Sequence, residues 1–97
     1  MSAGFRVALV VPSNWQAVTG SDMSRLQCDA TTVGQAVEWL IDKHPELRKR
    51  LFAHDGDRVA SWVNVFLGEQ NIRDVDGLAT VITGPDTITI LHAVAGG

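Results

Sequence analysis

The sequence holds a single cysteine, Cys28, and this scarcity excludes several kinds of site. One thiol cannot form an internal disulfide, a zinc site built from several cysteines or a four-cysteine iron–sulfur cluster. Cys28 lies in the short alternating run Leu26-Gln27-Cys28, and we interpret it as a small buried hydrophobe rather than a nucleophile. The chain also has no glycine-rich phosphate loop, no His-x-x-x-His pair and no paired-carboxylate motif, so no catalytic constellation is apparent.

Long apolar runs and an excess of positive charge are missing as well. No apolar segment reaches the roughly 18 residues that a membrane-spanning helix needs. The formal net charge is −3, which argues against nucleic acid as the main partner. The first residues carry one arginine and a short, strand-like apolar run, unlike a secretory signal. We therefore expect a cytoplasmic protein that associates with neither nucleic acid nor membrane.

What the chain does have is enough apolar sequence for one domain. Its 97 residues are 45% hydrophobic and 20% charged, which is ordinary for a small globular protein. Polar residues predict a loop from Pro12 to Asp22, with Trp15 either covering the loop or contacting a partner. Alternating apolar residues predict strands from Phe5 to Val11, Met23 to Asp29, Trp62 to Leu67 and Thr87 to Leu91.

A helical period replaces the alternation after the second predicted strand. Thr32 and Gln35 have the spacing of a capping box, in which Thr32 caps the helix and Gln35 reaches back. Pro45 predicts the end of the helix near His44, and a short second helical turn is expected between Pro45 and Phe52. The apolar residues at helical spacing form one stripe: Val33, Ala36, Val37, Leu40 and Ile41.

The order of these elements predicts the fold class. A short return strand from Asn71 to Arg73 comes between the last two longer strands. Because only one amphipathic helix is available to cover one face of the sheet, we predict an α+β fold of the β-grasp (ubiquitin-like) type. In that fold a mixed sheet packs on one main helix. Residues 1–91 would form the domain, and residues 92–97 a flexible tail.

The sequence ends in Gly96-Gly97, which is the strongest single hint of function. Two residues without side chains can enter a narrow slot that any Cβ would block. At average glycine usage a terminal pair arises by chance in roughly 0.5% of chains. A frayed end without function is the alternative, so the weight of the pair depends on the rest of the chain.

The rest of the chain resembles a known family. Asp86 to Gly97 is similar to the C-terminus of the ubiquitin-like sulfur carriers of the MoaD/ThiS family, and Val63 to Leu67 followed by Asn71-Ile72-Arg73 is similar to the family's central hairpin. The Ala-Val-Ala-Gly-Gly ending resembles that of the subgroup that carries sulfur for cysteine biosynthesis in actinobacteria. The family usually has proline where this chain has His92. Proline would stiffen the start of the tail, so this difference bears on which partner reads it.

The resemblance implies a protein substrate, not an enzyme. An E1-like adenylyltransferase/sulfurtransferase would use ATP and Mg²⁺ to join the Gly97 carboxylate to AMP, and a sulfur donor would then leave a thiocarboxylate on Gly97. A sulfur-accepting biosynthetic enzyme would take the sulfur. The chain itself would bind no cofactor and no metal, and we expect a monomer when it is alone.

The resemblance also suggests how the tail is recognised. Gly96 would let the backbone pass a narrow channel, and small apolar contacts would come from Ala93, Val94 and Ala95. An enclosing groove could pair with such an extended segment as an added strand. His92 is either a partner contact or an ordinary surface histidine.

A second recognition surface is expected on the sheet. Phe66 and Leu91 lie on the strand faces opposite the helix-facing residues. They either form a patch that docks the activating enzyme or are scattered surface apolar residues. We expect Trp62, at the start of its strand, to be packed. Two other functions stay open: a ubiquitin-like modifier conjugated to lysines through the same glycine, and the small subunit of a molybdopterin synthase.

Overall fold

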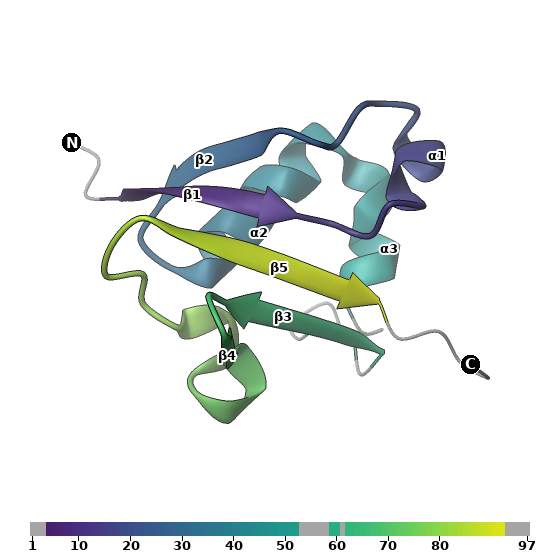
Figure 1. The fold of residues 1–97 in the computed structure, drawn as a ribbon. Helices are drawn as coiled ribbons and strands as arrows, with labels where there is room; N and C mark the ends of the chain where they lie inside the picture. The colour runs from purple at the N-terminus through teal and green to yellow at the C-terminus, as the bar shows by residue number, and fades with distance from the viewer. Residues whose placement is uncertain (1–3, 53–58, 61, 93–97) are drawn as a thin grey trace.

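The computed structural model describes residues 4–52, 59–60 and 62–92, and it contains one mixed sheet with helices against one face (Figure 1). The strands are β1 (Phe5–Val10), β2 (Leu26–Ala30), β3 (Val63–Leu67), β4 (Gln70–Asn71) and β5 (Asp86–His92). The α-helices are α1 (Trp15–Thr19), α2 (Val33–Lys43) and α3 (Arg48–Leu51). The 3-10 helices are η1 (Pro45–Leu47), η2 (Ile72–Asp74) and η3 (Gly77–Ala79).

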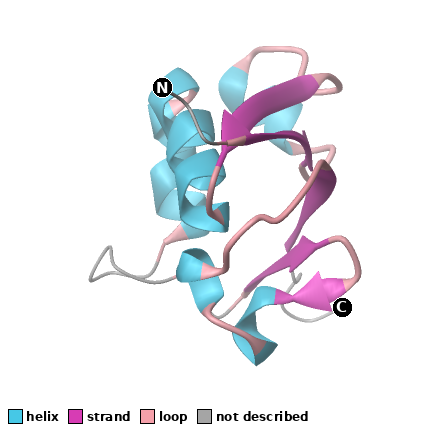
Figure 2. Cartoon of the chain, turned by 90° about the vertical axis from the view of Figure 1, so that its left-hand side faces the viewer, coloured by secondary structure: helices cyan, strands magenta, loops and turns pink. Residues whose placement is uncertain are grey.

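The strand order places the last strand in the middle of the sheet. The order is β2-β1-β5-β3-β4, in which β1 and β5 are parallel and the other neighbours are antiparallel. Figure 2, turned by 90°, shows the main helical layer to one side of the strands. A mixed sheet packed on one main helix is the predicted β-grasp arrangement, and this prediction is confirmed.

The core lies between α2 and the inner face of the sheet. All five residues of the apolar stripe on α2 are buried. The facing strands contribute the buried side chains of Val7, Leu9, Val63, Val65, Ile88 and Ile90. Because burying a large aliphatic side chain stabilises a fold by about 1.5–3 kcal/mol, this interface dominates the stability of the domain.

The start of α2 is capped much as the sequence predicts. Thr32 Oγ1 accepts a hydrogen bond from the backbone N–H of Gln35 (3.2 Å). The Gln35 side chain reaches back one residue further than a capping box requires, because its Oε1 accepts from the backbone N–H of Thr31 (2.7 Å). The helix ends at Lys43, and the short helical segments after Pro45 bury Leu47 and Leu51, as expected.

Two predictions about tryptophans need correction. The predicted loop from Pro12 to Asp22 contains the short helix α1, and Trp15 is fully buried in the core rather than lying over the loop. The helix ends at Gly20, whose φ of 71° is a left-handed conformation that glycine adopts without strain. Trp62 is 42% exposed and not packed, because it occupies a turn just before β3.

The strand boundaries also differ from the prediction. β2 begins at Leu26, and the return strand β4 is only Gln70–Asn71, because Ile72 turns inward into η2 and is buried. His92, which we expected to begin the tail, is the last residue of β5, since its backbone is paired with Val63.

Candidate functional site

The strand that leads to the predicted tail is held on both sides. β5 pairs with β1 as far as Thr89 and with β3 as far as His92, and its Ile88 and Ile90 are fully buried. The chain therefore leaves the sheet from a central strand with a fixed position. The tail residues Ala93, Val94, Ala95, Gly96 and Gly97 lie outside the described residues, so their roles remain predictions, as does a partner contact by His92.

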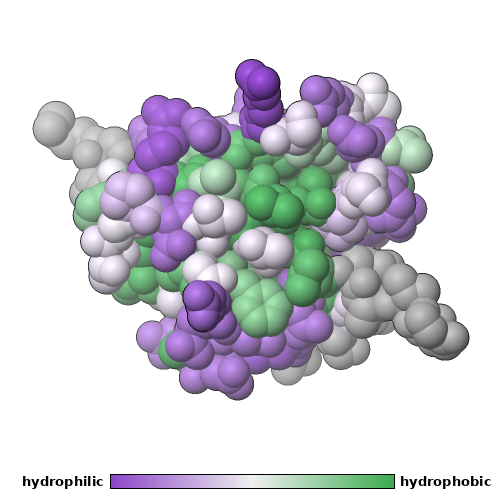
Figure 3. Space-filling model, viewed as in Figure 1, coloured by the Kyte–Doolittle hydropathy of each residue, from purple (hydrophilic) through white to green (hydrophobic). Residues whose placement is uncertain are grey.

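The predicted recognition residues lie together on the outer face of the sheet. Phe66 and Val10 are both registered opposite Thr89, from its two sides. Leu91 lies two residues further along β5, at the diagonal position from Phe66, where side chains are about 7–8 Å apart. We call Val10, Phe66 and Leu91 the sheet-face patch. Figure 3 shows apolar side chains over the middle of this face, with polar side chains around them.

The patch presents apolar surface that no described element covers. Val10 is 49% exposed and Leu91 is 50% exposed, while Phe66 is partly buried. Exposed apolar surface rimmed by polar residues is typical of a protein interaction site. The predicted location of Phe66 and Leu91 opposite the helix is confirmed, and their docking role stays a prediction.

Sequence reasoning missed one member of the sheet-face patch, Val10. Val10 alternates with the core-facing Leu9 and so faces outward, and the unbroken apolar run from Val7 to Val10 was the signal that both faces of β1 carry apolar residues. The structure leaves Trp62 exposed beside Val63, whose pairing partner is His92.

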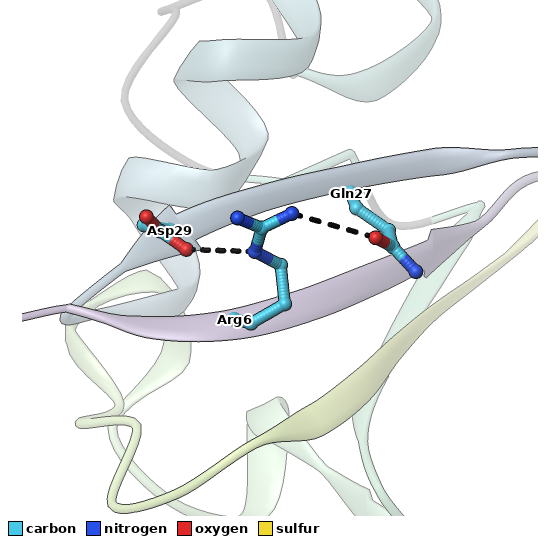
Figure 4. Close-up of polar contacts among 3 residues, drawn as sticks. All are labelled: Arg6, Gln27 and Asp29. Carbon is cyan, nitrogen blue, oxygen red and sulfur yellow. Dashed lines mark hydrogen bonds and ion pairs between the residues drawn. The ribbon is translucent and has the colours of Figure 1, made fainter.

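The β2 side of the outer face is polar. Arg6 on β1 forms an ion pair with Asp29 (Nε to Oδ1, 2.9 Å) and a longer hydrogen bond to Gln27 Oε1 (3.5 Å), as Figure 4 shows. Both charged side chains are more than half exposed, so their pairing contributes about 0–1 kcal/mol. These residues make the β2 side of the outer face hydrophilic.

The one thiol of the chain is not a candidate for carrying sulfur. Cys28 is 7% exposed on the core side of β2. Burial raises the pKa of its thiol, and the negative charge of Asp29 raises it further, against a smaller opposite effect of Arg6. Because the thiolate is the nucleophilic form, burial and the raised pKa both disfavour nucleophilic attack by Cys28. The prediction that Cys28 is a small buried hydrophobe is confirmed.

Neither a metal site nor a membrane span is found in the described part of the chain. No group of three or more His, Cys, Asp or Glu side chains there is arranged to hold a metal ion. None of the helices within residues 4–52, 59–60 and 62–92 is long and apolar enough to cross a bilayer. The candidate site consists of the exit of β5 and the sheet-face patch next to it.

Comparisons with known proteins agree with this arrangement. Residues 9–97 match the model of the ThiS family. The sulfur carrier protein CysO of Mycobacterium tuberculosis is 29% identical over 92 residues, which cover 94% of this chain and 98% of that protein. Among solved structures, the BexX/CysO complex of Amycolatopsis orientalis contains a chain with a TM-score of 0.80 and 26% identity, covering 94% of this chain and 99% of that one.

A modifier protein has a similar structure. The small archaeal modifier protein 1 of Methanosarcina acetivorans has a TM-score of 0.79 and 26% identity, covering 99% of this chain and all of that one. The family match includes α2, the sheet-face patch and the diglycine ending. This chain belongs to the ThiS family.

Proposed function

We propose that this chain is a sulfur-carrier protein and not a catalyst. Its Gly97 carboxylate is activated by an E1-like enzyme, is converted to a thiocarboxylate, and donates sulfur in the biosynthesis of cysteine or another sulfur-containing metabolite. The observation that supports this most directly is the position of β5. This central strand ends next to the exposed sheet-face patch, so one partner can hold the patch and receive the tail.

The chemistry explains why a partner must act on the carboxylate. A carboxylate resists nucleophilic attack because resonance spreads its charge. The Gly97 oxygen attacks the α-phosphorus of ATP, pyrophosphate leaves, and an acyl-adenylate forms. A sulfide-level nucleophile supplied by the partner then attacks the carbonyl carbon, the bond to AMP breaks, and AMP leaves with the electron pair. The partner binds the ATP and Mg²⁺, while this chain supplies the carboxylate and a surface to hold.

The test is adenylation of the full chain by the E1-like enzyme encoded in the same genome. ATP–pyrophosphate exchange should require this chain and should vanish when Gly97 is deleted, while the circular dichroism spectrum stays unchanged. Mass spectrometry of the protein from its native cell should show the mass gain of one oxygen replaced by sulfur. A normal exchange rate with the Gly97 deletion would contradict the proposal.

The match to an archaeal modifier protein supports a second candidate function, conjugation of Gly97 to lysine side chains. Both functions begin with the same adenylate and differ in the nucleophile that displaces AMP. Branched lysine peptides that carry Gly-Gly in a digest of native-cell proteins would favour conjugation. Stable co-purification with a larger catalytic subunit would instead favour the role of a molybdopterin synthase small subunit.

A further inference from the structure

Arg73 makes two short hydrogen bonds to the backbone at the start of β3. Its Nη2 donates to the carbonyl oxygens of Ala60 (2.8 Å) and Val63 (2.7 Å). A guanidinium Nη carries two hydrogens, so both bonds form together. Bonds from a charged donor are stronger than neutral ones. Arg73 therefore holds the chain in one position where it enters β3.

The place of this contact explains why an arginine is needed. β4 pairs only with Phe66 and Leu67, so the Val63 carbonyl lies on a part of the β3 edge that β4 does not reach. The backbone of Arg73 is also held in place, because its N–H donates a hydrogen bond to Oδ1 of Asn71 (3.0 Å). At the start of β3, the Arg73 side chain thus supplies the hydrogen bond that a neighbouring strand would otherwise donate to the Val63 carbonyl.

The start of β3 also pairs with the last residues of β5, from which the chain continues into the tail. Val63 is the residue paired with His92, and Asn64 is paired with Leu91 of the sheet-face patch. We propose that Arg73 is a positioning residue for the C-terminal tail. By fixing the start of β3, it fixes the last residues of β5 and so the point at which the chain passes into the tail. This inference rests on the proposed function, since it concerns delivery of Gly97 to the activating enzyme.

Loss of the Arg73 contact should therefore affect the rate of adenylation and leave the affinity for the activating enzyme unchanged. The partner holds the body through the sheet-face patch, whereas the two side-chain hydrogen bonds of Arg73 go to the backbone carbonyls of Ala60 and Val63, which are not members of that patch. A loosened exit leaves the body bound but presents the Gly97 carboxylate to ATP less often. Because misplacement of a reacting group by about 1 Å can cost as much as 100-fold in rate, we expect the loss to appear in kcat for adenylation and not in Kd.

The experiment compares Arg73→Ala and Arg73→Lys with Arg48→Ala, a matched control that removes one positive charge from an exposed ion pair with Glu38 on the helical side. Backbone amide exchange is measured at Leu91 and at Leu9 of β1. In Arg73→Ala we expect exchange at Leu91 to accelerate about tenfold relative to Leu9 and kcat to fall about tenfold with Kd unchanged. Arg73→Lys should lie between, since an ammonium group lacks the guanidinium geometry.

Three results would overturn the inference: equal acceleration at Leu91 and Leu9, which indicates a merely structural role; an effect on Kd with kcat unchanged; or no effect on either readout. The lysine variant keeps the test decisive if the alanine variant does not fold. The exchange measurement needs no enzyme. If the unaltered chain is never adenylated, the proposed function fails, while the exchange data still decide whether Arg73 holds the end of β5.

Discussion

Leu91 offers the sharpest test of the sheet-face patch, because half of its side chain is available to a partner. Its exposure is 50%. Complete burial of a leucine side chain is worth about 1.5–3 kcal/mol, so the exposed half can contribute about 1 kcal/mol to binding. In Leu91→Ala this loss corresponds to about a fivefold increase in Kd for the activating enzyme.

The packed half of the Leu91 side chain determines how far Leu91→Ala lowers the stability of the free domain. Its loss destabilises the free domain by about 1 kcal/mol, which lowers Tm by about 4–8 °C for a domain of this size. The variant should therefore remain folded at 25 °C. Binding can be measured by titration calorimetry and folding by thermal denaturation on the same sample.

A matched control comes from the other end of the sheet. Val81 is 60% exposed and is bridged to Thr32, near the start of β1. Val81→Ala should bind like the unaltered chain, and Val10→Ala should weaken binding in the same direction as Leu91→Ala. If Leu91→Ala and Val10→Ala bind as tightly as Val81→Ala, the sheet-face patch is not the docking surface and our reasoning is wrong.

Three further predictions concern the body of the domain. Leu40→Asp should abolish folding, because it places an unpaired charge at a fully buried position; a cooperative melt close to that of the unaltered chain would show that the register of α2 is misread. Gly34→Ala should lower Tm, because its Cβ would lie 2.9 Å from the Leu78 carbonyl oxygen, and overpacking costs about 1–3 kcal/mol against a helix-propensity gain of about 1 kcal/mol; a raised Tm is the contrary result. Cys28 should be alkylated by iodoacetamide more slowly than free cysteine at pH 8 and should react readily in denaturant, because burial raises the pKa of its thiol; equal rates with and without denaturant would contradict this.

Local signals were sufficient for α2 and for the longer strands. The spacing of Thr32 and Gln35, the apolar stripe and Pro45 each act within a few residues, so the helix and both its ends follow from neighbouring sequence. α1 could not be predicted in the same way. It is five residues long, and its stabilisation comes from placing Trp15 in a core formed by distant segments.

The same distinction applies to the candidate site, whose local features could be predicted from the sequence and whose long-range contacts could not. The diglycine ending and the outward positions of Phe66 and Leu91 could be predicted, because one is a local motif and the other follows from alternation. That Val10 joins them depends on the parallel pairing of β1 with β5, which joins distant parts of the chain. The contact of Arg73 with the carbonyls of Ala60 and Val63 depends on the path of the chain around β4, which no sequence pattern reveals.

The central place of β5 has a consequence for how the protein is made. β1 and β3 are synthesised before β5, yet they join one sheet only when β5 pairs with both of them. A chain interrupted before Asp86 would leave two unpaired strand edges and lose Ile88 and Ile90 from the core, and such chains tend to aggregate or be degraded. A folded domain therefore requires translation through β5, the strand that leads to the C-terminal residues.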